Sequence, residues 1–343
     1  MRIIMKKKIC VIILFFLLVV IDCSLLQQIQ KRAAFYIAFE PQEFIQKLRN
    51  QEVSPETVLK FREYESEEDE AQDDMTFTQY LLAYYASDLT EKNELKDVYK
   101  RLLHFHKEEI EKQEAYLDSI WSDIVYFPVP DTIWDEEKKV TFGDTWMQSR
   151  TYGGDRGHEG CDIMADINER GNYPVISVSD GTIEQMGWLE LGGYRIGIRS
   201  PHGAYFYYAH LSDYAEGLSV GDEIHAGELI AFMGDTGYSK TEGTVGNFDV
   251  HLHFGIYLND ENKQEFSVNS YSILQYLYQE KKSLGLDYND LLKFTLYHFQ
   301  KDPEIRLKCQ QRLEYIMIDE FQDNDAIQNE LMEVLCGYHK NLI

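Results

Sequence analysis

The distribution of apolar and polar residues divides the chain into four parts. Residues 9–21 form an unbroken apolar run, whereas residues 77–124 carry apolar side chains at spacings of three and four, which predicts helices. From residue 126, short runs rich in β-branched and aromatic residues alternate with glycine-containing turns. This pattern predicts a compact all-β domain built of hairpins. Beyond residue 278 the spacing again favours helices, with one short apolar strand between them.

The first part has the pattern of an export signal. Arg2 and the lysines at 6–8 precede the apolar run, and no small-residue cleavage site follows closely. We therefore predict a signal anchor over 1–26, with a cleaved signal peptide as the alternative. The basic residues would stay in the cytoplasm, so the rest of the chain would lie outside the cytoplasmic membrane.

A helical stalk is predicted for residues 27–126. Within it, Ser54-Pro55-Glu56 combines an N-cap residue, a first-turn proline and a first-turn acid. The acidic run Glu63–Asp74 is typical of a solvated loop or a frayed helix end. The sequence does not indicate whether this region tethers, inhibits or recruits.

Four turn signals mark the hairpins of the β domain, for which we set bounds of 127–277. The turns are Ser179-Asp180-Gly181, Leu191-Gly192-Gly193, Pro201-His202-Gly203 and Val220-Gly221-Asp222. In the last part, 278–343, a short strand over Tyr315–Ile318 leads directly into Asp319-Glu320. Helices are expected around Leu292 and through Leu331. The fold class is thus α+β: an anchor and helices, a mainly antiparallel β domain and a short α/β segment.

Charge and cysteine content narrow the possible functions. The chain has 33 basic and 59 acidic residues, a formal net charge of −26, which argues against non-specific binding of nucleic acid. The five cysteines include no CxxC pair, so the spacing indicates neither a thiolate zinc site nor a disulfide framework.

Two short segments of the β domain carry residues suited to bind a metal ion. Catalytic zinc takes three protein ligands and keeps one open position. His158 and Asp162 share one face if their segment is extended, because strand side chains alternate with a period of two. His251 and His253 share a face for the same reason. Gly160, between the first two, would leave room for an ion.

A third pair of histidines serves as an internal control. His104 and His106 are also separated by one residue, but they lie in a stretch with helical spacing. On a helix, residues two apart point in different directions, so this pair is not expected to chelate a metal.

Residues 128–275 resemble the catalytic domain of the lysostaphin-type (LytM-like) zinc metallopeptidases. The resemblance runs through five motifs in the family's order. They are Arg156–Ile163, Pro174–Ile183, Tyr208-Ala209-His210-Leu211, the glycine turns from Val220 to Gly237, and His251-Leu252-His253-Phe254-Gly255. Cys161 departs from the aliphatic residue usual at that position of the first motif and is expected to fill the core.

The resemblance implies the role of each residue in the site. His158, Asp162 and His253 would bind one zinc ion per chain, and His210 and His251 would flank the water that attacks the peptide bond. It implies a zinc-dependent endopeptidase that cuts peptide cross-links of bacterial peptidoglycan. The alternative is a non-catalytic module of the same fold that binds wall peptides or activates another hydrolase. Degenerate relatives lose a ligand or a histidine, whereas all five positions are filled here.

The last part resembles a different family. Leu286–Leu292 and Tyr315–Asp323 are similar to the segment around the second motif of UvrD-type superfamily 1 DNA helicases. There is no GxxxxGK[ST] phosphate loop in the sequence, and about 65 residues cannot form two motor domains. We therefore expect no ATP or nucleic-acid activity from this segment, including Asp319 and Glu320.

Overall fold

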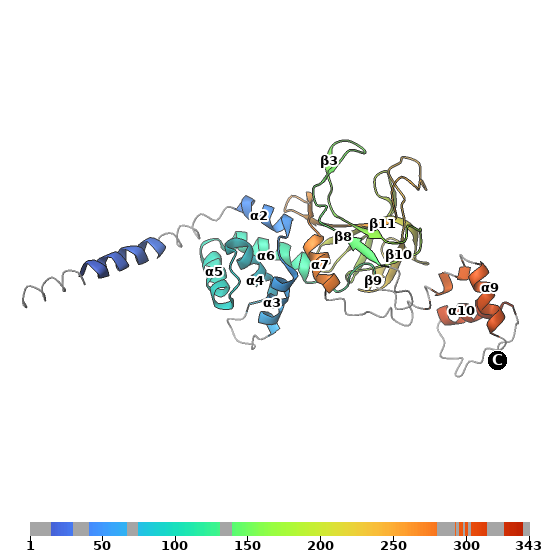
Figure 1. Ribbon diagram of the computed structural model, residues 1–343, viewed down its shortest axis with the longest axis horizontal. Coiled ribbons are helices and arrows are strands. Elements are labelled where there is room, and N and C mark those ends of the chain that lie inside the picture. Colours follow the sequence, from blue (N-terminus) through green and yellow to red (C-terminus); the bar gives the residue numbers. More distant parts are fainter. Residues whose placement is uncertain are drawn as a thin grey trace, which may run out of the picture. The chain divides into compact units, whose positions relative to one another are not determined.

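The computed structural model describes residues 15–29, 41–66, 75–130 and 139–279, and in the C-terminal part residues 292, 295–297, 299–300, 303–313 and 326–338. Its backbone is drawn in Figure 1. Two compact units can be distinguished, one formed by residues 1–49 and 56–117 and the other by residues 50–55 and 118–343.

Residues 15–29 form a helix near the start of the chain. Its apolar side chains are exposed, with Phe15, Phe16 and Val20 each about 64% accessible. None of the helices in the described residues combines the length and apolar character needed to cross a membrane. The signal anchor over 1–26 therefore stays a prediction.

The next part is helical, as the spacing predicts. Its helices are α2 (Pro41–Asn50), α3 (Pro55–Ser66), α4 (Phe77–Ser87), α5 (Lys92–Phe105) and α6 (Lys107–Trp121). Helix α3 begins at Pro55, and its residues up to Ser66 include the start of the predicted acidic loop; residues 67–74 lie outside the described part. A capping box fixes the start of α4, where Thr76 and Gln79 exchange side-chain to backbone hydrogen bonds.

Twelve short strands and one helix form the β domain. They are β1 (Val140–Phe142), β2 (Ser149–Arg150), β3 (Arg156–Gly157), β4 (Cys161–Ala165), β5 (Pro174–Ile176), β6 (Gly181–Leu189), β7 (Gly193–Arg199), β8 (Tyr205–Tyr214), β9 (Glu223–Ile224), β10 (Leu229–Met233), β11 (His251–Asn259), β12 (Glu265–Val268) and α7 (Tyr271–Gln279). All four predicted turns fall between strands or directly before one. The mainly antiparallel fold is confirmed, because every strand pair is antiparallel.

Strand β11 lies at the centre of the main sheet, whose order is β1-β4-β11-β8-β7-β6-β9. On one side of β11, His253 lies opposite Asp162 of β4. On the other side, the same residue lies opposite Ala209 of β8. This register brings the two predicted metal-binding segments together on adjacent strands.

The two faces of β8 and β11 carry different side chains. Phe206 and Phe254 are fully buried and stack with ring centroids 6.2 Å apart, so they belong to the core. The other face carries Tyr205, Tyr207 and Tyr257, whose rings contact one another across the strands. The alternation of β-strand side chains thus separates a dry core from an aromatic surface.

The C-terminal part is helical where it is described. Helices α9 (Pro303–Arg312) and α10 (Ala326–Cys336) are present, and α10 contains the predicted Leu331. Tyr297, in the helical residues 295–297, stacks on Phe232 with ring centroids 4.0 Å apart and donates a hydrogen bond to Asp213. The start of this segment is therefore packed onto the β domain. The predicted strand Tyr315–Ile318 lies outside the described residues.

Candidate metal centre

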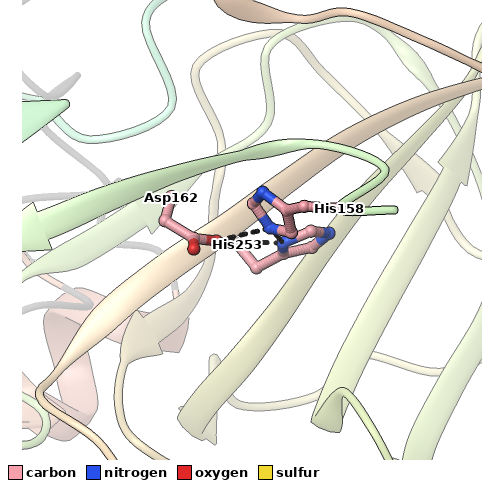
Figure 2. Close-up of side chains that lie close together, drawn as sticks. All are labelled: His158, Asp162 and His253. Atoms are coloured by element: carbon pink, nitrogen blue, oxygen red, sulfur yellow. Dashed lines mark hydrogen bonds and ion pairs between the residues drawn. The ribbon is translucent and has the colours of Figure 1, made fainter. Parts of the chain in front are cut away.

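Three predicted ligands converge in the β domain, as Figure 2 shows for His158, Asp162 and His253. His253 Nδ1 lies 3.0 Å from Asp162 Oδ1 and 2.8 Å from His158 Nε2. His158 Nε2 is also 3.0 Å from Asp162 Oδ1. Among the described residues, these three form the one group of metal-ligating side chains that meet within 4.8 Å.

The three side chains reach the centre in different ways. Asp162 and His253 face each other across β4 and β11, as their strand positions predict. His158 instead lies in the irregular connection between β3 and β4, so its segment is not one continuous strand. The expectation that a two-residue period alone aligns His158 with Asp162 was therefore too simple; the bend before β4 sets the position of His158.

Gly160 has a different role from the one expected. A Cβ atom at this position would lie 2.6 Å from the Phe254 carbonyl oxygen and 2.7 Å from Cε1 of His253. Both distances are far below van der Waals contact, so a side chain here would displace the His253 ring. Gly160 thus makes room for a ligand side chain and for the strand that carries it.

Hydrogen bonds to further residues orient two of the predicted ligands, His158 and Asp162. His158 Nδ1 lies 3.1 Å from the Thr145 carbonyl oxygen and 3.0 Å from Thr145 Oγ1. A proton held there leaves the lone pair of Nε2 facing the centre. Arg150 Nη2 donates to Asp162 Oδ2 at 2.7 Å, so Oδ1 is the oxygen that faces the histidines.

The local electrostatics favour an ionised Asp162 next to a neutral His253. Burial by itself raises the pKa of Asp162, but hydrogen bonds to His158 and His253 outweigh it and hold that pKa well below its usual range. Burial lowers the pKa of His253, although Asp162 opposes this effect. Metal binding requires deprotonated ligands, and this environment supplies them.

The donor set fits zinc. Two imidazole nitrogens and one carboxylate oxygen are ligands that zinc accepts, with bond lengths of about 2.0–2.2 Å. Three ligands also match the number that catalytic zinc sites use, leaving one position open. The 2.8–3.0 Å separations between the donor atoms are close to the spacing of about 3.3 Å that tetrahedral bonds of this length give.

Two more histidines stand beside the three ligands. His251 and His210 have ring centroids 4.7 Å apart, and His251 Nε2 lies 3.8 Å from Asp162 Oδ1. A backbone carbonyl group orients each ring. The Nδ1 of His251 lies 2.7 Å from the carbonyl oxygen of Asp249, and the Nδ1 of His210 lies 2.8 Å from that of Thr236. The Nε2 atoms are therefore left for other partners.

His210 reaches this position through a break in β8. Its φ is +62°, and the pairing of β8 with both β10 and β7 shifts register around it. Such a bulge turns a side chain from one face of a sheet to the other. Burial, and then the nearby His251 and His253, lower the pKa of His210 well below its usual value.

Tyr152 and Asn168, two residues outside the motifs, contact residues that surround the site. Tyr152 stacks face to face on Tyr238, with centroids 4.7 Å apart. Asn168 donates to Asp249 and accepts from the Val250 amide, so it orders the residues before β11. His104 and His106, at the end of α5, belong to no metal-ligating group among the described residues.

The centre opens into a groove of about 630 Å³. All five predicted histidine and aspartate residues line it. Further residues that line the groove come from β3, β7, β8 and β11: Arg156, Arg195, Arg199, Tyr205, Tyr207 and Tyr257. For the tyrosines of β8, the aromatic run in the sequence was the available signal.

Comparisons with known proteins agree with this geometry. Residues 156–265 match the family model of peptidase family M23. A protein from Ruminococcus gnavus, described as a glycyl-glycine endopeptidase, has a crystal structure with 38% sequence identity and a TM-score of 0.57; the match covers 68% of this chain and 90% of that one. The chain belongs to peptidase family M23. Family membership confirms the resemblance to the LytM-like enzymes, and M23 peptidases depend on zinc.

A curated M23 relative extends the comparison beyond the β domain. The L-Ala–D-Glu endopeptidase of Bacillus subtilis is 35% identical over 213 residues, which cover 60% of this chain. The chain spans 62% of the length of that relative.

The C-terminal resemblance is confirmed as well. Residues 241–343 match the UvrD/REP helicase N-terminal domain. The DNA helicase PcrA of Leuconostoc citreum is 36% identical over 62 residues, which are 18% of this chain and 8% of that protein. The C-terminal part of the chain is therefore similar to a segment of the UvrD/REP helicases, and its match overlaps that of the M23 family over residues 241–265.

Proposed function

We propose that the protein is a zinc-dependent metalloendopeptidase that hydrolyses peptide cross-links of bacterial peptidoglycan. One observation carries the proposal: three convergent ligands and two further histidines all line a single open groove. The two M23 relatives are described as an L-Ala–D-Glu endopeptidase and a glycyl-glycine endopeptidase, which supports the substrate class.

His158, Asp162 and His253 would hold one zinc ion per chain. Bound there, zinc supplies a Lewis acid that activates water near neutral pH and polarises the peptide carbonyl. All three residues line the groove, so substrate and metal ligands would share one surface.

His210 and His251 would carry the proton chemistry. Both are nearly buried, and both have Nδ1 at a backbone carbonyl, which fixes a tautomer with Nε2 free to accept a proton. One would take a proton from the attacking water, and the other would stabilise the charge that develops on the carbonyl oxygen. Transfer of a proton to the departing amine completes the hydrolysis.

The place of action would be outside the cytoplasm, with residues 1–26 as a signal anchor. The basic and apolar pattern of the sequence supports this proposal. Fractionation of cells that express the full chain tests it: an anchored protein stays with membranes after a high-salt wash, whereas a cleaved one appears in the medium shortened at its N-terminus.

The alternative function is a module that binds wall peptides without cutting them. One experiment separates the two functions. The full chain, purified in mild detergent, is analysed for bound zinc and incubated with purified bacterial wall while new amino groups are measured. Zinc near one per chain with release of amino groups, lost in His251→Ala, supports the peptidase. Zinc binding without any release of amino groups favours the binding module.

A further inference from the structure

The groove beside the metal centre has a basic side that the proposed hydrolysis does not use. Arg156 and Arg195 both line it. Arg195 Nη2 donates to Gln185 at 3.3 Å, and its Nη1 has no hydrogen-bond partner among the described residues. Arg156 Nη2 lies 3.5 Å from the Tyr238 hydroxyl. These are long contacts to neutral groups, and within the described chain neither arginine has a carboxylate partner.

The strand register places Arg195 level with the metal centre. His253 lies opposite Ala209 on β8. On the other side of β8, Ile196 of β7 lies opposite Tyr208. The preceding residue, Arg195, is therefore level with Ala209, two strand spacings from His253. Two spacings are about 10 Å, which is about three residues of an extended peptide.

The side chains of Arg195 and Arg156 line the same groove as His253. Tyr207 belongs to β8, the strand between β7 and β11, and its ring lies 5.9 Å from that of His253. Burial raises the pKa of Tyr207, and the charges of Arg195 and Arg156 oppose that effect. A peptide with its cleaved bond at the centre therefore brings residues within about three positions of that bond to the side of the groove that carries these two cations.

Three glutamates line the groove as well: Glu159, which is exposed and follows His158, Glu184 and Glu265. Glu184 is paired with Arg199, whose Nη2 lies 2.7 Å from the Oε2 of Glu184. Glu265 lies opposite Asn259, the last residue of β11, six residues beyond His253. That separation is about 20 Å along the strand. Among the described residues, none of these carboxylates forms an ion pair with Arg195 or Arg156.

We propose that Arg195, together with Arg156, binds a carboxylate of the substrate peptide next to the cleaved bond. The proposal rests on the proposed function and names its substrate class: an acidic stem peptide instead of a glycine bridge. A guanidinium group holds a carboxylate through paired, charge-assisted hydrogen bonds. A glycine bridge has no side-chain charge to offer, so it supplies neither arginine with a carboxylate partner.

The test compares two peptides that differ in one group. Both contain an L-Ala–D-Glu bond; in one the free carboxylate of the glutamate is intact, and in the other it is a carboxamide. For the zinc-loaded full chain we expect kcat/KM about 30-fold higher for the acidic peptide, equivalent to about 2 kcal/mol at about 1.4 kcal/mol per tenfold. Arg195→Gln should lower the rate on the acidic peptide to that on the amide. The rate on the amide itself should stay within about threefold.

Arg199→Gln is the matched control. It removes a guanidinium from the same strand and the same groove, but one that already has Glu184 as its partner. This variant should keep the preference for the acidic peptide. Equal rates on the two peptides for the unmodified chain would overturn the proposal without needing any variant.

Binding measurements separate this inference from the proposed hydrolysis. If no peptide is cut, calorimetric titration of the zinc-loaded chain with both peptides still compares the carboxylate with the amide. Tighter binding of the acidic peptide, lost in Arg195→Gln, supports carboxylate recognition although the peptidase function has failed. Equal binding of both peptides overturns the recognition as well.

Discussion

Replacing Gly160 by alanine tests whether the metal centre depends on the close approach between β4 and β11. The new Cβ would stand 2.6 Å from the Phe254 carbonyl oxygen and 2.7 Å from His253 Cε1, whereas ordinary contact begins at 3.4 Å. The carbonyl belongs to the central strand and cannot move away alone. The imidazole must therefore shift by about 0.7 Å, more than the roughly 0.5 Å within which a functional site holds its groups.

The expected result is a loss of zinc affinity with modest loss of fold stability. Displacing one ligand by this amount should weaken zinc binding about 10- to 100-fold, the range seen when the groups supporting a ligand are removed. That range corresponds to about 1.4–2.7 kcal/mol. Overpacking adds about 1–3 kcal/mol of destabilisation. Competition with a chromogenic chelator measures the affinity, and thermal unfolding of the zinc-free protein measures the stability.

Gly143→Ala provides the control. No atom lies within 4 Å of a Cβ built at Gly143, and its φ is outside the left-handed region. This variant should bind zinc as the unmodified chain does. If Gly160→Ala also bound zinc with unchanged affinity, the argument that Gly160 makes room for His253 would be refuted.

Three further predictions concern catalysis, pH and the C-terminal segment. His251→Ala should keep zinc near one per chain but lower wall cleavage by about 10²- to 10⁴-fold, the usual contribution of a general acid or base, as measured by release of amino groups. Burial raises the pKa of Tyr208 above its unfolded value of about 10, so the contribution of this tyrosine to stability should be constant below pH 10 and be lost above it. Each such tyrosine adds a slope of up to about 1.4 kcal/mol per pH unit, and Tyr208→Phe should reduce the slope in urea titrations; an unchanged slope would contradict the assignment. Tyr297→Ala removes the stacking on Phe232 and should lower the free energy of unfolding by about 1–2 kcal/mol in urea titration, whereas no loss would show that the segment is only an appendage.

The sequence predicted the fold class because its parts differ in period and composition. The turn signals and the alternation around His251 and His253 were enough to place both histidines on one face of a strand. Motif order then identified the partner segment with Asp162. These inferences succeeded because they depend on local geometry, which a strand or turn imposes on every residue within it.

The position of His210 could not be derived from local rules. Simple alternation along β8 puts it on the face opposite Ala209, yet the bulge at φ +62° turns it toward His251. A bulge depends on how three strands pair, and this information is spread over residues far apart in sequence. Arg150 and Arg195 could not be selected from the sequence for the same reason. Arg150 gains Asp162 as its partner only in the folded sheet, and only there does Arg195 lack a carboxylate partner among the described residues.

The anchor and the helicase-like strand show another limit. The apolar run of residues 9–21 indicates export because it is wholly apolar and basic residues precede it. Both are properties of the sequence, so a folded structure does not test them. The strand over Tyr315–Ile318 was predicted from its apolar run and lies outside the described residues, so it stays a prediction.

The unequal placement of the three ligands has a consequence for how metal is exchanged. Asp162 and His253 are held by paired strands inside the sheet, so their amide hydrogens should exchange with solvent only when the domain opens as a whole. His158 lies on the irregular connection after the two-residue strands of the β2–β3 hairpin, where its backbone bonds only to Met147 and Gln148. We therefore expect zinc to exchange through movement of the His158 segment, at a rate faster than the exchange of the amide hydrogens of Asp162 and His253.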